Sequence, residues 1–259
     1  MPTDLFRDNL ARYRAACSLE AGCEESAFDS HALTVVPRPP AARDQRPAQV
    51  LTFGTGTVIT VQPDYLDWAR TLVFKRHFDA FSPSAFARPM LAEMERRGSI
   101  GAARGASLGF LPGVISLAPE LPPNVRVLRI DRDWRAKRLE SGVFDNSLGE
   151  PGEAFPELYW RWGLALIDAA GEPIAVTGAY DDGEALLEVG VDVIREHRGR
   201  GLAHTLVSVM NRAIADEGCT ATYYCAATNI RSHRTALAAG FVPVLTHTGI
   251  RVTEGITNT

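Results

Sequence analysis

The chain has few cysteines, no long hydrophobic run and no excess of basic residues. Only 4 of its 259 residues are cysteine. They include no C-x-x-C pair and their spacing does not suggest zinc, so we expect reduced thiols and no metal. The longest apolar stretches fall far short of a membrane span, and residues 1–17 hold acidic side chains and no apolar signal core. We therefore expect a cytoplasmic protein with no membrane partner.

The charge balance argues against nucleic acid as the main partner. The formal net charge is −4, and the only dense basic run is REHRGR at 195–200. Hydrophobic residues make up 46% of the chain, which supports a substantial core. The length suits one large or two modest domains.

The most informative stretch is VGVDVIREHRGRGLA, residues 189–203. A β-prone apolar run ends there in a basic, glycine-rich turn, and a helix pattern starts at once. Backbone N–H groups at a helix N-terminus lack intrahelical partners and carry the positive end of the helix dipole, so they bind phosphate oxygens. Glycine lets the backbone approach such a ligand closely. The pattern predicts an anion cradle, and the alternative is a basic surface turn.

The sequence of this turn limits the classes of ligand that it could bind. A dinucleotide fingerprint needs G-x-G-x-x-G. Gly199 and Gly201 supply its first two positions, but His204 occupies the third. No G-x-x-x-x-G-K-[ST] loop is present. What remains is R-x-x-G-x-A, at Arg198, Gly201 and Ala203, so a nucleotide- or NAD-linked enzyme is the disfavoured reading.

The segment after the cradle repeats the alternation of helix and strand. Apolar residues recur at helical spacing over 202–214, and ATYYCAAT at 221–228 is short and β-prone. Asn229 and Ser232 then open a second helix, which ends at Gly240 and Phe241.

R-x-x-G-x-A and the later N-x-x-S…GF together resemble two motifs of the GCN5-related N-acetyltransferase superfamily. The resemblance covers residues 125–250 and looks closest to a larger bacterial branch with an extra N-terminal region. It implies an α/β (α+β) fold: a mixed, mostly antiparallel central sheet, splayed between its fourth and fifth strands and flanked by helices. It also implies acetyl-CoA as co-substrate and a transferase activity on an amine acceptor.

In this superfamily the pantetheine arm enters the splay and pairs with the free edge of strand four. Strand four falls at about 186–194 and strand five at 220–226. The resemblance implies that the backbones of Asp192 and Val193 face the cofactor, although Asp192 could instead tie down a loop. The pyrophosphate would be held by Arg198, Gly199, Arg200, Gly201, Leu202 and Ala203, and the pantetheine approached by Asn229 and Ser232.

The implied reaction is direct attack by a primary amine, of a small molecule or a protein, in a ternary complex. Only about one lysine-like amine in 10³ is neutral at pH 7, so a base or water chain is needed. Glu188 on strand four is the candidate base, the alternative being an exposed strand carboxylate. The Val193 N–H is a candidate donor to the oxyanion.

The departing thiolate also needs a proton, and many relatives use a tyrosine seven residues after the Asn. Here that position is Ala236. Tyr223 and Tyr224 point to opposite faces of strand five, and either could substitute or simply pack; we take Tyr224 as the candidate. Ser232 is a second candidate, unless it only caps its helix. The missing tyrosine keeps open a catalytically weak CoA-binding regulatory module.

The predicted boundary separates an N-terminal α/β region, 1–120, from the acetyltransferase domain, 121–259. The first region could be a degenerate acetyltransferase-like half, a lid over the acceptor pocket or a homodimer contact. Trp160 and Trp162 are predicted on one strand face, as core packing or as an aromatic wall of the acceptor pocket. The other predicted elements are helices at 4–17, 63–79, 84–97 and 131–141, strands at 108–117, 125–130, 157–167 and 172–179, two strands within 50–61, and a loop at 101–109.

Overall fold

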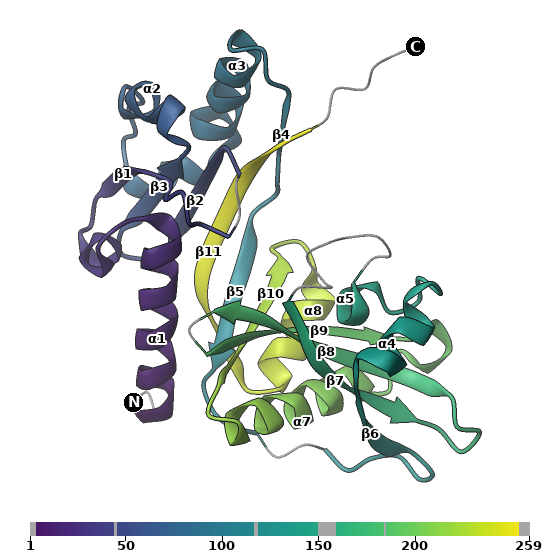
Figure 1. Cartoon of the computed structure of the whole chain (residues 1–259). Helices are drawn as coiled ribbons and strands as arrows, with labels where there is room; N and C mark the ends of the chain where they lie inside the picture. Colours follow the sequence, from purple (N-terminus) through teal and green to yellow (C-terminus); the bar gives the residue numbers. More distant parts are fainter. Residues whose placement is uncertain (1–3, 44–45, 117–118, 150–158, 184, 254–259) are drawn as a thin grey trace, which may run out of the picture. The chain divides into compact units, whose positions relative to one another are not determined.

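The computed structural model describes residues 4–43, 46–116, 119–149, 159–183 and 185–253. Its contacts divide the chain into two compact units, each described by itself (Figure 1). The first unit comprises Met1–Leu10, Phe110–Cys225 and Asn229–Pro243, and the second Ala11–Gly109, Ala226–Thr228 and Val244–Thr259. This division follows the packing of the chain and does not coincide with the predicted domain boundary after residue 120. That boundary stays a prediction.

The first unit is built on a mixed sheet whose strand order is β5-β10-β9-β8-β7-β6. Neighbours from β6 to β9 run antiparallel, and β9 and β10 run parallel. The expected mixed, mostly antiparallel sheet is therefore confirmed. The strands are β5 (Ser107–Pro112), β6 (Arg126–Ile130), β7 (Trp160–Ile167), β8 (Pro173–Gly183), β9 (Leu186–Val193) and β10 (Thr220–Ala226).

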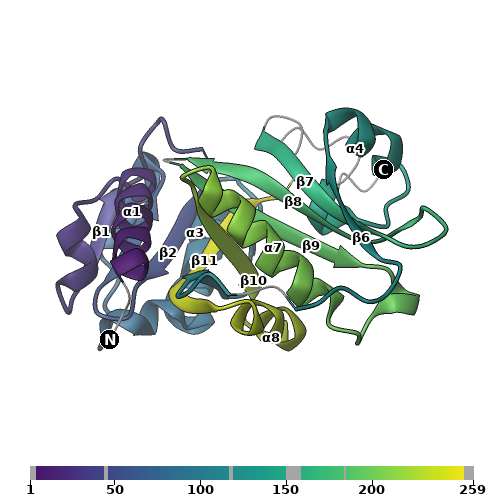
Figure 2. The ribbon, with the colours of Figure 1, turned by 90° about the horizontal axis from the view of Figure 1, so that it is seen from below.

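Helices cover both faces of this sheet. Helix α7 (Leu202–Asp216) packs on β7, β8 and β9, with α8 (Ile230–Ala238) beside it (Figure 2). Helices α4 (Arg132–Leu139) and α5 (Asp145–Leu148) lie on the other face (Figure 1). Asp131 begins α4 by accepting a hydrogen bond from the Trp134 N–H at 2.9 Å. Helix α1 (Asp4–Ala21) starts in this unit and extends beyond the predicted 4–17.

Two glycines let α5 lie directly on the sheet. Gly178 of β8 and Gly190 of β9 are register partners. A Cβ at Gly178 would overlap the carbonyl oxygen of Ser147, and one at Gly190 would overlap that of Asn146. Only glycine therefore allows the α5 backbone to approach this closely. The short α5 was not among the predicted elements.

The two tryptophans of β7 face opposite sides of the sheet, so the expectation of a shared face is wrong. The register with β8 shifts between Trp160, opposite Tyr180, and Trp162, opposite Ala179. This bulge at Arg161 interrupts the two-residue alternation of side chains. Trp160 lies in the core under α4 and α5. The Trp162 indole instead donates to a carboxylate just beyond the end of α7, at 3.2 Å.

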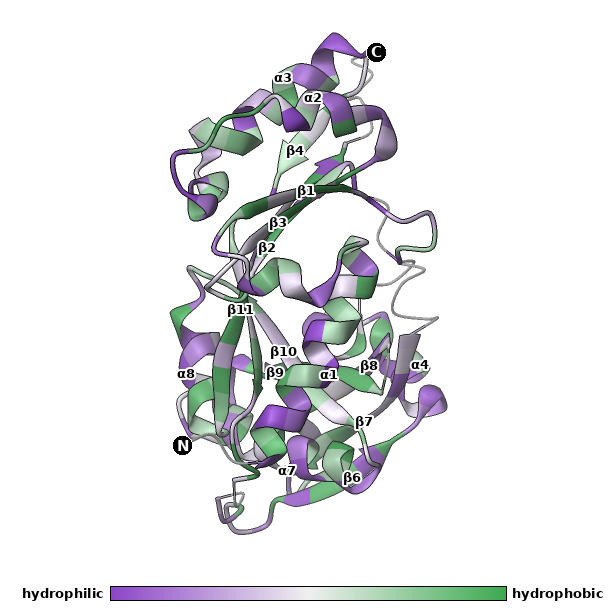
Figure 3. Ribbon diagram, turned by 90° about the vertical axis from the view of Figure 1, so that its left-hand side faces the viewer, coloured by the Kyte–Doolittle hydropathy of each residue, from purple (hydrophilic) through white to green (hydrophobic). Residues whose placement is uncertain are grey.

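In the second unit the strand order is β1-β3-β2-β11, with β4 also paired to β11. β1 and β3 are parallel, and the other pairs are antiparallel. Figure 3 shows the strongest apolar colouring of this unit along β1 and β3, and every residue of β3 is buried. The strands are β1 (Leu33–Pro37), β2 (Ala48–Thr52), β3 (Thr57–Val61), β4 (Gly101–Ala103) and β11 (Phe241–Val252).

Short helices cover this second sheet. The predicted helix 63–79 is interrupted over 71–76, and the predicted loop 101–109 is wrong at both ends, where β4 and β5 form. The segment 84–97 is helical, as predicted. The helices are η1 (Glu25–Asp29), η2 (Pro63–Tyr65), α2 (Leu66–Arg70), η3 (His77–Phe81), the π-type η4 (Pro83–Ala87) and α3 (Arg88–Arg96); η5 (Arg195–His197) belongs to the first unit.

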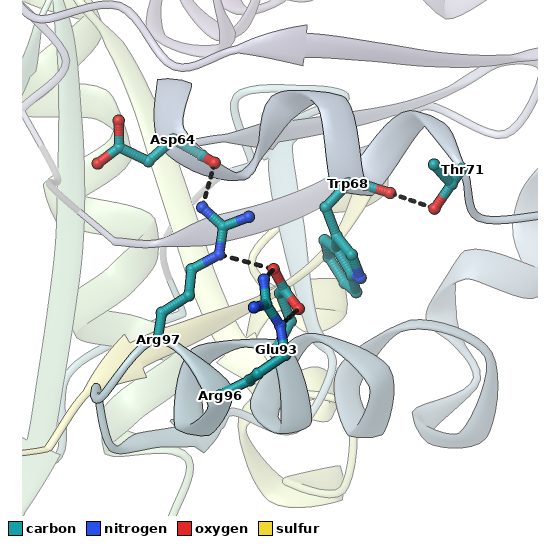
Figure 4. A network of polar contacts seen from close by, with 6 residues as sticks. All are labelled: Asp64, Trp68, Thr71, Glu93, Arg96 and Arg97. Atoms are coloured by element: carbon teal, nitrogen blue, oxygen red, sulfur yellow. Dashed lines mark hydrogen bonds and ion pairs between the residues drawn. The ribbon is translucent and has the colours of Figure 1, made fainter.

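A buried carboxylate of α3 is linked to η2 through an arginine (Figure 4). Glu93 accepts hydrogen bonds from Arg96 Nη2 at 2.7 Å and Arg97 Nε at 2.6 Å. Arg97 also donates to the carbonyl oxygen of Asp64. The hydrogen bond from Arg96, assisted by that from Arg97 against the effect of burial, lowers the pKa of Glu93 from 4.5 to about 2. The contact is therefore ionic throughout the neutral range.

Among the described residues, none of the helices is long and apolar enough to cross a lipid bilayer.

Candidate functional site

The predicted anion cradle forms the start of α7. Gly201 is the residue before the helix, and its φ of 79° lies in the left-handed region, as does the φ of 79° at Gly199. Both positions face open space, so backbone conformation rather than crowding favours glycine there. Gly201 makes no side-chain cap hydrogen bond. The first N–H groups of α7, those of Leu202 and Ala203, therefore receive no cap from the residue before the helix.

Two arginines of the turn stay at the surface. Arg198 Nε donates to the carbonyl oxygen of Val193 at 2.9 Å, and Arg200 Nη2 donates to that of Glu196 at 3.4 Å. Arg198 thus folds back onto the end of β9 and links the cradle to the strand. Both side chains are exposed beside the helix N-terminus, where their charge adds to the positive end of the helix dipole.

The sheet opens next to the cradle, as predicted. The parallel register of β9 and β10 comprises Leu186 with Thr220, Leu187 with Ala221 and Glu188 with Thr222. β9 continues to Val193 and β10 to Ala226 without a further register pair between them. The splay therefore begins after Glu188.

The free edge of β9 can be assigned residue by residue. The Ile194 N–H donates to the carbonyl oxygen of Ile174 at 3.1 Å, which makes this a hydrogen-bonded antiparallel pair. Backbone groups alternate along such a ladder. Those of Asp192 accordingly point toward β8, whereas those of Val191 and Val193 point toward the splay. Of the two backbones predicted to face the cofactor, that of Val193 therefore points into the splay and that of Asp192 does not.

The Asp192 side chain has a structural task. Its carboxylate accepts hydrogen bonds from Asn146 Nδ2 at 2.7 Å, the Ser147 N–H at 2.9 Å and Ser147 Oγ at 2.8 Å. Asp192 therefore ties α5 to β9, which is the alternative that the sequence left open for it.

Glu188 and Tyr224 lie on the α5 face of the splay. Thr222 and Tyr224 both donate to Asp182 Oδ2, each at 3.1 Å. Glu188 is the register partner of Thr222, so its half-buried side chain lies on the same face. Asp182 belongs to this polar group although sequence reasoning missed it, because Asp181-Asp182-Gly183 has the composition of a turn.

Ser232 lies on the opposite face with the other tyrosine. Tyr223, which is 3% exposed, has its hydroxyl 2.7 Å from Ser232 Oγ. The Ser232 N–H donates to Asn229 Oδ1 at 3.1 Å, so Asn229 caps α8. Burial raises the pKa of Tyr223 and of Cys225, and a hydrogen bond with Ser232 opposes each shift. Ala236, at the family's tyrosine position, is fully buried. The candidate catalytic residues are thus divided between the two faces of β10.

The parts of the site come from consecutive elements of one segment. β9, the cradle, α7, β10 and α8 all lie within or overlap residues 182–244, which match the family model described as FR47-like protein. No curated protein is significantly similar to the chain.

Solved structures resemble the chain in fold at low sequence identity. A Drosophila protein has a TM-score of 0.51 and 19% identity, over 83% of this chain and 77% of that one. A GCN5-related N-acetyltransferase from Kribbella flavida has a TM-score of 0.49 and 18% identity, over 94% of this chain and 97% of that one. A GCN5-related N-acetyltransferase-like protein from Streptococcus suis has a TM-score of 0.47 and 16% identity. That last match covers 62% of this chain and 66% of the other, just under two thirds of it.

A mixed sheet that opens between two parallel strands, with a glycine-led helix N-terminus at the opening, defines the N-acetyltransferase class of fold. Residues 182–244 match the family model described as FR47-like protein, and the arrangement of sheet and helices is the fold of GCN5-related N-acetyltransferases.

Proposed function

We propose that this protein transfers an acetyl group from acetyl-CoA to a primary amine of a small molecule or a protein, by direct attack in a ternary complex. The observation that carries the proposal is the adjacency of the cradle and the splay. Arg198 connects them through its hydrogen bond to the Val193 carbonyl. A ligand with a pyrophosphate at one end and an extended amide-bearing arm fits both features at once.

In this proposal the chain's own groups hold the co-substrate. The N–H groups of Leu202 and Ala203 and the turn residues Gly199 to Gly201 would bind the pyrophosphate, with the charges of Arg198 and Arg200. The free edge of β9 would pair with the pantetheine amides, and Asn229 and Ser232 at the start of α8 would lie along the same arm. The Val193 N–H would donate to the oxygen of the acyl group as negative charge develops there.

The acceptor side is proposed to be the α5 face. Glu188 would accept the proton of the attacking amine, directly or through water, because its side chain lies at the point where β9 and β10 separate. Tyr224 and Ser232 remain the candidate donors to the departing sulfur. Their surroundings differ, since the Tyr224 hydroxyl donates to Asp182 whereas Ser232 lies beside Tyr223.

The test is calorimetric titration of the purified protein with acetyl-CoA, with NADH as the control ligand. Saturable micromolar binding of acetyl-CoA and none of NADH would support the cofactor and justify a screen of amine acceptors by thiol release. A folded protein that does not bind acetyl-CoA would overturn the proposal.

A second function, a CoA-binding regulatory module with little turnover, is favoured by one observation. Ala236 occupies the family's tyrosine position and is fully buried, so the usual proton donor is missing. Acetyl-CoA binding without turnover across a broad panel of amines would select this function.

A further inference from the structure

Tyr223 is the first residue of β10 beyond the last register pair with β9, Glu188 with Thr222. Its ring is buried and held on two sides. Phe110 packs edge-on to it with ring centroids 6.3 Å apart, and Phe241 packs at a tilt with centroids 6.0 Å apart. The phenol is therefore held in one direction, and its hydroxyl lies 2.7 Å from Ser232 Oγ.

The relative acidity of the two hydroxyls favours one direction of their hydrogen bond. A phenol is a stronger acid than an aliphatic alcohol, so the Tyr223 hydroxyl is the better donor and Ser232 Oγ the better acceptor. Burial raises the pKa of Tyr223 above its ordinary 10.0, with the Ser232 hydrogen bond opposing this, so the phenol is protonated at neutral pH. The hydrogen of Ser232 is then left to point at another acceptor.

Ser232 itself is well placed to use that hydrogen. Its backbone N–H is fixed by Asn229 Oδ1 at 3.1 Å, and its side chain is half-buried rather than enclosed. Ser232 stands at the start of α8, directly after β10, the strand that lines one side of the splay. A ligand sulfur lying in the splay would be an acceptor for its hydrogen.

We propose that Tyr223 is a positioning residue that orients Ser232 so that the Ser232 hydroxyl donates to the sulfur of the departing coenzyme A. This inference rests on the proposed function and deepens it, because it selects one of the two candidate donors. It replaces the tyrosine that the family places at the position of Ala236 with a tyrosine from β10 acting through a serine of α8.

The step balances in atoms and charge. The amine nitrogen forms a bond to the acyl carbon, the carbon–sulfur bond breaks, and its electron pair goes to sulfur. The amine loses one proton to Glu188, while the Ser232 hydroxyl stabilises the negative sulfur by a hydrogen bond. Glu188 then releases its proton to water and the sulfur takes one from water, so neither residue is consumed.

The first test compares Tyr223→Phe, Ser232→Ala and the double variant. Phenylalanine keeps the ring packing, and the unfolding midpoint of each variant checks the fold. With an acceptor amine, kcat should fall roughly tenfold or more in each single variant, the loss expected for a hydrogen bond to a developing charge. In Tyr223→Phe, KM for acetyl-CoA should change little. The double variant should be no slower than Ser232→Ala, because residues acting as a unit are not additive. Tyr65→Phe, a buried tyrosine of the second unit, is the matched control and should retain wild-type turnover.

The second test does not depend on turnover. CoA and desulfo-CoA, which lacks the thiol, are titrated calorimetrically across the pH range in which the thiol ionises. A donor at the sulfur stabilises the thiolate, so the wild type should prefer CoA increasingly as pH rises, by roughly tenfold at the upper end. Both single variants should lose that preference, and Tyr223→Phe should still bind desulfo-CoA as the wild type does.

Each outcome has a distinct meaning. A Tyr223→Phe variant with wild-type kcat and CoA preference, or single effects that add in the double variant, would overturn the positioning role and leave the proposed function standing. A wild type that binds neither CoA nor acetyl-CoA would overturn both.

Discussion

Thr222 of β10 lies opposite Glu188 of β9, and this is the last register pair before the two strands separate. One partner donates its hydroxyl to Asp182, and the other carries the carboxylate proposed to act as base. The point at which the sheet opens is therefore also the point at which acidic groups gather, on the face that carries α5.

The cradle prediction concerns Arg198→Glu combined with Gly201→Glu. Two carboxylates at a helix N-terminus would repel phosphate, and a side chain at Gly201 would also strain the left-handed backbone. Affinity for acetyl-CoA should fall at least about a hundredfold, as each lost charge-assisted hydrogen bond is worth roughly 1.5–3 kcal/mol. Calorimetric titration measures this affinity. Arg212→Glu, exposed and further along α7, should bind normally, and a weak effect at the cradle would argue for a different anion site.

The base prediction concerns Glu188→Gln. The amide keeps the shape of the side chain but cannot accept the amine proton, so kcat at neutral pH should drop roughly a hundredfold, as for removal of a general base. The loss should shrink as pH approaches the pKa of the amine. Glu172→Gln, exposed in the β7–β8 turn, is the control. Unchanged turnover in Glu188→Gln would remove this residue as the base.

The α5 prediction concerns Asp192→Ala. Its carboxylate holds Asn146 and Ser147 through the contacts described above. Removing it should lower the free energy of unfolding by about 1–3 kcal/mol, the range for a hydrogen-bonded group whose partners are left unmatched. Urea titration gives the value, with Asp216→Ala, exposed at the end of α7, as the reference. Equal stability of the two variants would contradict the tie.

The close-approach prediction concerns Gly190→Ala. An added methyl group would overlap the Asn146 carbonyl, so α5 must move. We expect a loss of about 2 kcal/mol or more in unfolding free energy. Gly105→Ala meets open space and should change stability by less than about 0.5 kcal/mol. If both substitutions are tolerated equally, α5 does not rest on β9 as described.

The pH prediction concerns Glu93. Its folded pKa of about 2 is below its ordinary 4.5, so its ion pairs stabilise the fold fully above about pH 4.5 and progressively less as pH falls toward 2. Thermal unfolding of the wild type and Glu93→Gln should therefore differ most at neutral pH and converge in acid. A gap that stays constant down to the lowest pH at which both variants fold would mean that the carboxylate is not the stabilising group.

Local sequence pattern predicted the glycine turn before α7 and the opposed tyrosines of β10, and the resemblance implied the splay. The glycines Gly199 and Gly201 favour a left-handed backbone in the turn. Side chains alternate between the two faces of β10, which places Tyr223 and Tyr224 on opposite faces. The features that the sequence did not predict depend on residues distant in the chain. The prediction that Trp160 and Trp162 share a strand face was wrong because the bulge between them is set by the register of β7 with β8, which no local pattern encodes.

The remaining omissions have the same physical origin. The local sequence around Asp182 is typical of a turn, and its role depends on two hydroxyl groups of β10 that donate to it. Helix α5 is too short to show a period, and its place depends on glycines of two other strands. β11 contains Pro243 and mixed polarity, and it forms by pairing with β2 and β4, far earlier in the chain.

The separation of β9 from β10 also bears on how the protein should be handled. Beyond Glu188, β9 presents backbone groups that no register pair with β10 occupies, and an open strand edge is a template on which other chains can pair and aggregate. A ligand lying along that edge would shield it and, by mass action, stabilise the folded state. Colloidal stability during concentration and storage should accordingly improve when CoA is kept in the buffer.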